Sequence, residues 1–216
     1  MAVITISRQL GTHGARIART LAGELGYEFA DKSLINAVIR QYGLTRLSLI
    51  YDRKPRLREL FDQDSTTTID MMNQTIAAIA ARGDVVILGR GGYRVLAGMA
   101  DVVNVFITAS SPVRARRIGK RDHIDTDEAA ELLKADDAIR ARFVRLFYAA
   151  DWADTSAYDL VVDTSDCSDA DAVAQIVAAV RTLPRTGASA RAANLSIDPV
   201  LAETVDATMA RRAAKA

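Results

Sequence analysis

The chain has 216 residues, half of them hydrophobic and a quarter charged, which is the composition of an ordinary globular protein with room for one substantial core. Lysine plus arginine number 28 and aspartate plus glutamate 27, which argues against a general binder of nucleic acid or of membrane surfaces, because such binding needs an excess of positive charge. One cysteine, Cys167, and two histidines exclude an intrachain disulfide and a four-ligand Cys/His zinc site. The sequence shows neither a signal-peptide pattern at its start nor a run of roughly 20 apolar residues, so we expect a cytoplasmic protein.

Short β-branched runs alternate with helical patterns along the chain. Residues 3–7 are the first such run, and Ile17, Leu21 and Leu25 behind it recur at the spacing of one buried helix face, which Gly26 would end. In chain order the patterns predict a strand over 3–7, a helix up to 25, a strand over 27–30, mostly helix over 33–82 with breaks near Gly43 and Pro55, strands over 85–88 and 102–108, helices over about 112–121 and 126–148, a strand over 160–163 and a closing helix around 173–180.

Strands that alternate with helices imply βαβ units and a parallel sheet, so we expect a three-layer α/β domain over residues 1–183. Residues 184–197 include a stretch rich in Arg, Gly, Ala and Ser and are expected to be a linker. Leu201, Val205 and Met209 then predict an amphipathic helix within 198–216. This tail helix could pack back on the domain, serve a homodimer or begin a further module, and the first two are favoured.

The segment from Arg8 to Arg16 lies between the first strand and its helix, where backbone N–H groups and the helix dipole can hold an anion. It does not match GxxxxGK[ST], because Gly14 stands where the lysine would fall and Ala15 where the magnesium-binding hydroxyl would. Arg8 and Arg16 could supply the missing positive charge. The plain alternative is that any strand–helix turn favours glycine.

Two further positions follow strands. Arg90 stands between glycines directly after the strand over 85–88, at the sheet edge where open α/β sheets bind ligands, although it could be an ordinary surface arginine on a turn. Asp31 follows the second strand and could bind a nucleotide or simply cap the next helix. The sequence does not decide between these readings.

The helices over 112–121 and 126–148 are crowded with charge, which usually marks a solvated face. Arg114, Arg117 and Arg121 share one face, as do Asp136 and Arg140, and a cationic helix that closes over phosphates could neutralise their charge during transfer. No Ser/His/Asp or Cys/His arrangement is present, so acyl transfer has no support.

An ordered set of segments resembles the cytidylate kinase-like family of P-loop kinases and spans roughly residues 2–182. The set comprises Ile4-Thr-Ile-Ser-Arg-Gln-Leu-Gly, Leu25-Gly-Tyr-Glu-Phe-Ala-Asp-Lys, Ile87-Leu-Gly-Arg-Gly-Gly, Ala100-Asp-Val-Val-Asn-Val-Phe-Ile, and the stretch from Asp151-Trp to Asp163-Thr-Ser. Ala138 departs from the usual cytidylate kinase lid, which carries another arginine there, and the lysine-free loop departs further from the ordinary kinase pattern.

The resemblance implies a P-loop kinase-type fold with a helical lid, ATP and Mg²⁺ as cofactors, and a nucleoside monophosphate, CMP or dCMP first, as acceptor. It implies that Gly11, Thr12, His13, Gly14, Ala15 and Arg16 hold the ATP phosphates, that Asp31 and Arg90 bind the acceptor, and that Arg8, Arg16, Arg140 and Arg142 carry the catalytic charges. No residue is assigned as a metal ligand. The alternatives are a nucleotide-binding regulatory protein without turnover and a kinase of another small phosphate acceptor.

Overall fold

The computed structural model describes residues 1–42, 63–183 and 189–214. The helix breaks predicted near Gly43 and Pro55, and part of the predicted linker, lie outside the described residues. Within the described part of the chain, no helix is long and apolar enough to cross a membrane.

The centre of the fold is a parallel sheet, and the described strands run in the order β2-β3-β1-β4-β5. β1 pairs with both β3 and β4, so its carboxyl end lies in the middle of the sheet edge, with Ile6 opposite both Leu88 and Val105. The strands are β1 (Val3–Arg8), β2 (Glu28–Ala30), β3 (Val85–Leu88), β4 (Val102–Thr108) and β5 (Leu160–Asp163). This confirms the predicted α/β class with a parallel sheet.

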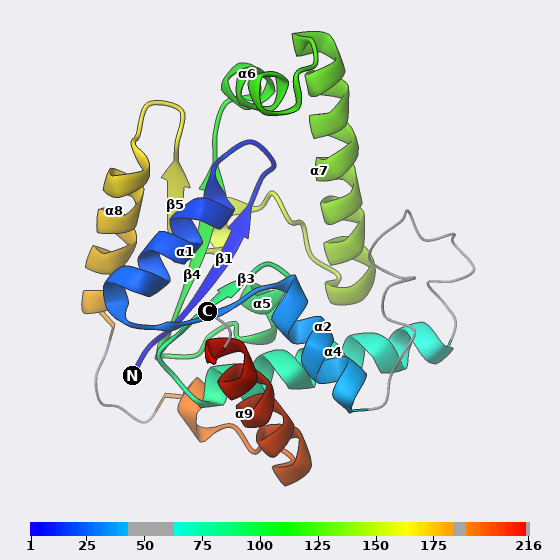
Figure 1. Ribbon diagram of the computed structural model, residues 1–216, viewed down its shortest axis with the longest axis vertical. Helices are drawn as coiled ribbons and strands as arrows, with labels where there is room; N and C mark the ends of the chain where they lie inside the picture. Colours follow the sequence, from blue (N-terminus) through cyan, green and yellow to red (C-terminus); the bar gives the residue numbers. More distant parts are fainter. Residues whose placement is uncertain (43–62, 184–188, 215–216) are drawn as a thin grey trace.

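Helices cover both faces of the sheet and its carboxyl edge (Figure 1). On one face lie α1 (Gly14–Leu25) and α8 (Asp169–Arg181), and on the other lie α2 (Lys32–Gln41), α4 (Gln63–Ala81), the short α5 (Gly92–Val95) and α9 (Pro199–Ala213). Above the edge stand α6 (Ser111–Asp122) and α7 (Thr126–Tyr148), and the 3₁₀ turns are η2 (Thr155–Ala157) and η3 (Ala192–Asn194).

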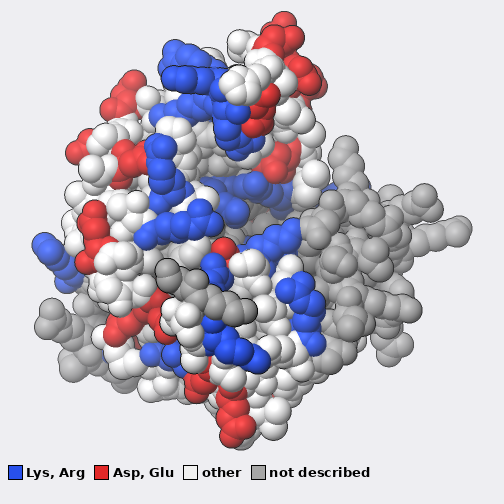
Figure 2. Space-filling model, viewed as in Figure 1, with Lys and Arg blue, Asp and Glu red and all other residues white. Residues whose placement is uncertain are grey.

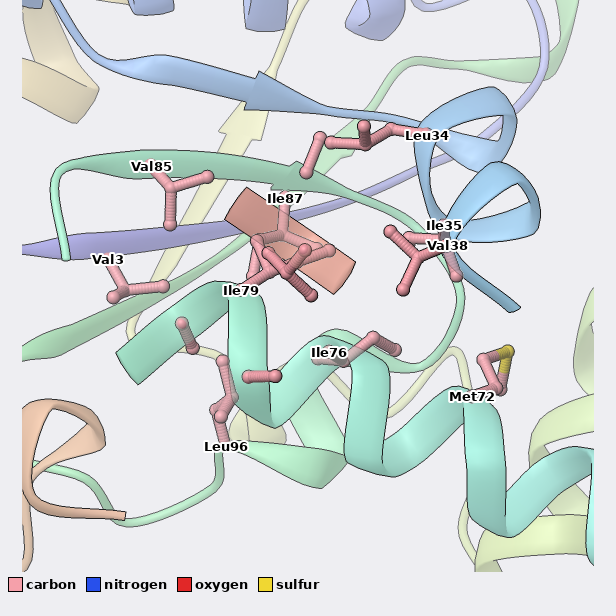
Figure 3. Close-up of a cluster of buried hydrophobic side chains, with 14 of the residues drawn as sticks. Val3, Leu34, Ile35, Val38, Met72, Ile76, Ile79, Val85, Ile87 and Leu96 are labelled. Atoms are coloured by element: carbon pink, nitrogen blue, oxygen red, sulfur yellow. The ribbon is translucent and has the colours of Figure 1, made fainter. Parts of the chain in front are cut away.

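The strands bury both of their faces because successive side chains point to opposite sides. Ile4 and Ile6 of β1 pack with α1 and α8, whereas Val3 packs with α2 and α4. Figure 3 shows the second of these cores, where Ile76 and Ile79 of α4 point toward the strands. The core thereby holds β1 rigidly, and with it the loop that follows.

Local signals fix the helix ends that the site depends on. Gly26 ends α1 in the left-handed conformation, with φ of 65°, as the sequence predicts. Asp125 caps the start of α7 by accepting a hydrogen bond from the Glu128 N–H. The observed α7 has the predicted bounds, so the long charged helix stands at the carboxyl edge of the sheet.

The C-terminal segment packs against the rest of the fold. Asp101 accepts hydrogen bonds from the N–H groups of Ala192 and Ala193, and Ala192 is fully buried, so this part of the predicted linker is fixed to the domain. Leu201, Val205 and Met209 of α9 are buried in the same core as α2 and α4. The amphipathic face of the tail therefore has its partner within the chain.

Candidate phosphate-binding site

The loop between β1 and α1 opens into a hollow of about 630 Å³, within the usual range for small-molecule sites. Its lining comprises residues 8–16 together with Arg117, Ile118, Lys120, Arg121 and Arg140. Six of these residues are Lys or Arg and none is acidic, and Figure 2 shows Lys and Arg side chains around the hollowed part of this face. A hollow with this lining suits a polyanion.

Side-chain donors bind the carbonyl oxygens of residues 8–12 and so hold the loop in one conformation. The donors are Arg140 to the Arg8 carbonyl, Thr12 Oγ1 to Gln9 (2.8 Å), Arg114 Nε to Leu10 (2.7 Å), Arg117 to Gly11 (3.3 Å) and Thr164 Oγ1 to Thr12 (3.2 Å).

The loop conformation brings the start of α1 to the hollow. Gly11 has φ of 84°, and a Cβ on it would lie 2.9 Å from the Arg114 carbonyl oxygen, so only glycine fits. His13 precedes α1 in the left-handed conformation, with φ of 61°. The first N–H groups of α1 and its dipole therefore favour an anion at this end of the hollow.

Arg8 occupies the space that a side chain at position 14 would need. A Cβ built on Gly14 would lie 2.6 Å from the Arg8 Cβ and 2.9 Å from its Cγ. At the other end of the side chain, a Cβ on Gly89 would lie 2.5 Å from an Arg8 guanidinium nitrogen. Arg8 thus crosses from the end of β1 to the end of β3, and a lysine at position 14 is sterically incompatible with this placement.

The surroundings of Arg8 disfavour its positive charge. Loss of solvent, followed by the charges of Arg140 and Arg90, lowers its pKa to about 10, well below the ordinary range for arginine, although Asp136 acts in the opposite direction. Arg140 itself forms an ion pair with Asp136 at 2.8 Å. An anion in the hollow would relieve the repulsion between these guanidinium groups.

Arg16 lies at the rim of the hollow and is tied to α8. Its Nε donates to Asp169, and His13 Nδ1 lies 3.2 Å from the same carboxylate. Burial acts to raise the pKa of Asp169, but the hydrogen bonds from Arg16 and His13 outweigh it and lower that pKa. The Arg16 side chain is 64% exposed, so a bound anion would compete with Asp169 for it.

The arginines of α6 and α7 have different partners from those expected. Arg114 is only 3% exposed and forms a bidentate pair with Asp137 at 2.8 Å, so it joins α6 to α7 and does not face the hollow as a clamp. Arg117 donates to Thr164 as well as to the loop. Arg121 lines the hollow, whereas Arg142 is exposed and is not among the lining residues. The expected cationic clamp is therefore partly a set of structural contacts.

Asp31 and Arg90 stand at neighbouring strand ends. Asp31 follows β2 and caps α2 by accepting from the N–H groups of Ser33 and Leu34, at 3.0 and 3.1 Å. Arg90 follows β3 in the left-handed conformation, with φ of 59°. Because the strand order is β2-β3-β1, Asp31, Arg90 and Arg8 follow one another along the same edge.

Three contributors escaped the sequence reasoning. Thr164 holds the loop and lies in one of the segments that carry the resemblance, which was its only signal. Asp169 pairs with Arg16 across 153 residues, and Arg212 of α9 pairs with Asp31 across 181. The spacing of residues within one element cannot predict contacts between residues so far apart in the sequence.

Fold and loop together define the class, a three-layer α/β protein of P-loop kinase type. A solved structure of an uncharacterized protein from Eubacterium ventriosum has a TM-score of 0.68 to this chain at 20% identity, covering 84% of this chain and 98% of its own. A gluconokinase from Sinorhizobium meliloti has a TM-score of 0.53 at 14% identity, covering 84% and 93%. These two likenesses concern the fold alone.

The model of the cytidylate kinase-like family matches residues 3–166, and the chain belongs to this family. A relative from Ignicoccus hospitalis, named cytidylate kinase, is 34% identical over 166 residues, covering 76% of this chain and 91% of the relative. The suspected family is thereby confirmed, and α9 lies beyond the matched residues.

Proposed function

We propose that this protein transfers the γ-phosphoryl group of ATP to a nucleoside monophosphate, with CMP or dCMP as the first acceptors to test. The family and the relative named cytidylate kinase support the reaction class. The observation that carries the proposal is the placement of Arg8, whose side chain lies against Gly14 and lines the hollow, where its charge could replace that of a loop lysine.

In this proposal the loop residues 11–16 bind the phosphates through backbone N–H groups, and Arg8 and Arg140 neutralise the charge that spreads over the phosphoryl oxygens. Arg16, and Arg142 on the exposed side of α7, would engage phosphate as further cations. Asp31 and Arg90 would bind the acceptor at the adjoining strand ends. Phosphoryl transfer requires little beyond this positioning and neutralisation.

Bound ATP supplies the phosphoryl group, and Mg²⁺ supplies further positive charge to it. Magnesium in such sites is held by substrate phosphates and water with one or two carboxylates, and not by an all-protein cage. Within residues 1–42, 63–183 and 189–214, no three His, Cys, Asp or Glu side chains form a metal-binding group. We assign no protein ligand to the ion.

A second function has an observation in its favour. Asp31, the proposed acceptor-binding carboxylate, is engaged by Arg212, and the loop has neither lysine nor hydroxyl at its usual positions. Such a protein could bind nucleotide and act as a regulator without turnover. It would then be stabilised by ATP in proportion to ligand concentration over Kd, with no product.

Release of ADP in a coupled assay, with Mg²⁺ and a panel of CMP, dCMP, UMP, AMP and GMP, tests the proposal. We expect turnover with at least one monophosphate and a strong loss in the Arg8→Met variant. An Arg181→Met variant removes an exposed arginine of α8 far from the loop and serves as the matched control. ATP-dependent stabilisation without turnover would favour the regulator, and turnover only with other small phosphate acceptors would change the substrate class.

A further inference from the structure

The C-terminal helix α9 reaches the sheet edge that carries the proposed acceptor site. Its apolar residues are buried against α2 and α4. Asp206 of α9, which is not part of this core, forms an ion pair with Arg82 just after α4. Farther along the helix, Gln41 of α2 accepts hydrogen bonds from Thr208 (2.8 Å) and Arg211 (2.6 Å). The helix is therefore fixed along its length, and its last turn has a defined position beside α2.

The last turn of α9 places Arg212 beside Asp31. The two terminal guanidinium nitrogens of Arg212 donate to the two carboxylate oxygens of Asp31, at 2.9 Å and 3.2 Å. The Asp31 side chain is 15% exposed and that of Arg212 is 39% exposed. A bidentate pair of this kind fixes the plane of the carboxylate as well as its position.

The two oxygens of Asp31 are unequally occupied. Oδ1 accepts from Arg212, from the N–H groups of Ser33 and Leu34, and from the Ser33 hydroxyl at 2.7 Å, which uses its capacity. Oδ2 accepts from Arg212, and Arg19 of α1 approaches it only to 4.0 Å. Oδ2 therefore keeps lone-pair capacity for a ligand.

Burial acts to raise the pKa of Asp31. The hydrogen bonds from Arg212 and Ser33, the Leu34 N–H and the charge of Arg212 outweigh burial and hold the pKa well below the ordinary carboxyl range. An ionised carboxylate accepts hydrogen bonds and donates none.

We propose that Arg212 is a positioning residue for the acceptor site: it orients Asp31 so that Oδ2 accepts a hydrogen bond from an N–H or O–H group of the acceptor. The ligand class is a nucleoside monophosphate that presents a donor there, such as an exocyclic amino group of its base. This inference rests on the proposed function and adds to it a residue from a helix outside the family match. Arg212 acts through Asp31, and so affects the acceptor and not ATP.

The test compares Arg212→Met and Arg212→Lys with Arg211→Met in the full chain. Arg211 is the matched control because it lies in the same turn of α9 and binds Gln41, without a contact to Asp31 among the described interactions. Arg212→Met should raise the acceptor KM about tenfold while the ATP KM and the melting temperature change little. Arg212→Lys should recover part of the loss, since it keeps the charge but not the bidentate geometry. Arg211→Met should stay close to the wild type, because Thr208 still binds Gln41 and holds this part of α9.

A double-mutant cycle with Asp31→Asn separates positioning from a general effect. Because Arg212 acts through Asp31, Arg212→Met should have no further effect on acceptor KM or calorimetric Kd in the Asp31→Asn background. Unchanged acceptor binding in Arg212→Met would overturn the inference, and so would tighter binding or faster turnover, which would make Arg212 a block. A wild-type chain that binds CMP without turnover refutes only the proposed function, because calorimetry on the same variants still decides the inference. A wild-type chain that binds no monophosphate refutes both.

Discussion

Arg8→Met should stabilise the nucleotide-free protein while removing its affinity for phosphate. The lowering of the Arg8 pKa to about 10 corresponds to ~3 kcal/mol against the charged form, since one pKa unit is about 1.4 kcal/mol. Arg8 retains some contact with solvent, so we halve this figure and expect a gain of ~1–2 kcal/mol, or roughly 2–8 °C in melting temperature. Methionine keeps the length of the stem and its packing against Gly14.

The sign follows from the direction of the pKa change. Below pH 10, Arg8 is charged in both the folded and the unfolded state, so the cost of burying its charge is present in full at pH 7.5. That cost declines only as the pH rises through the folded-state pKa of about 10, where the native protein loses the proton first.

Thermal and urea unfolding at pH 7.5 measure this effect, in buffer without phosphate or sulfate, because either anion would occupy the hollow. Wild type should gain stability when ATP is added, and Arg8→Met should gain little. Arg181→Met controls for the loss of one positive charge. Arg8→Met that is less stable than this control, or that keeps the full ATP-dependent gain, would refute the reasoning.

Three further outcomes follow from the same contacts. Arg140→Ala should lower kcat tenfold or more while changing the free energy of unfolding by less than ~1 kcal/mol, because the loss of the ion pair with Asp136 is offset by the relief of repulsion between Arg140 and Arg8; equal losses in kinetics and urea unfolding would count against a role in phosphoryl transfer. Gly14→Ala should destabilise by ~1–3 kcal/mol and weaken ATP binding, because its Cβ would meet Arg8 at 2.6 Å, and urea unfolding should show a smaller cost in an Arg8→Gly background. Asp169→Asn should lower stability at pH 7 by less than ~1 kcal/mol, and the difference should shrink as the pH falls below the ordinary carboxyl pKa and through the lowered pKa of the folded protein, since the carboxylate contributes only while ionised; a constant difference from pH 7 to about 3 would contradict this.

The regular elements were predictable because their signals are local. The sequence predicts residues 85–88, 102–108 and 160–163 as strands and 126–148 as a helix, and the structure has these bounds. β-branched runs, capping residues and helical spacing all act within a few residues of each element. The parallel order of the strands then follows from their alternation with helices.

The site was predictable only in part, because its contacts are tertiary. The loop and Arg140 were recognised by position, but the burial of Arg114 against Asp137 depends on how α6 meets α7. The short helix α5 was missed because its four residues follow a glycine-rich turn without a repeating apolar face. The pairing of Asp31 with Arg212 depends on how α9 packs against α2 and α4, and no motif in the first 183 residues predicts this packing.

The Arg8 side chain and any side chain at position 14 would compete for the same space, which gives a physical reason for the absence of lysine from the loop. A lysine at position 14 would extend into the volume that the Arg8 side chain occupies. The positive charge of the loop can therefore come from Arg8 or from a lysine at position 14, but not from both. The charge of Arg8 lies at the end of the central strand β1. There the Arg8 backbone pairs with Ile107 of β4, and the guanidinium lies beside Gly89 after β3. A guanidinium fixed there can donate to two phosphate oxygens at once, where an ammonium acts as a point charge. On this reasoning, glycine is required at position 14 because it leaves room for the Arg8 side chain. The absence of lysine from the loop therefore does not by itself imply that the site lacks a positive charge for phosphate.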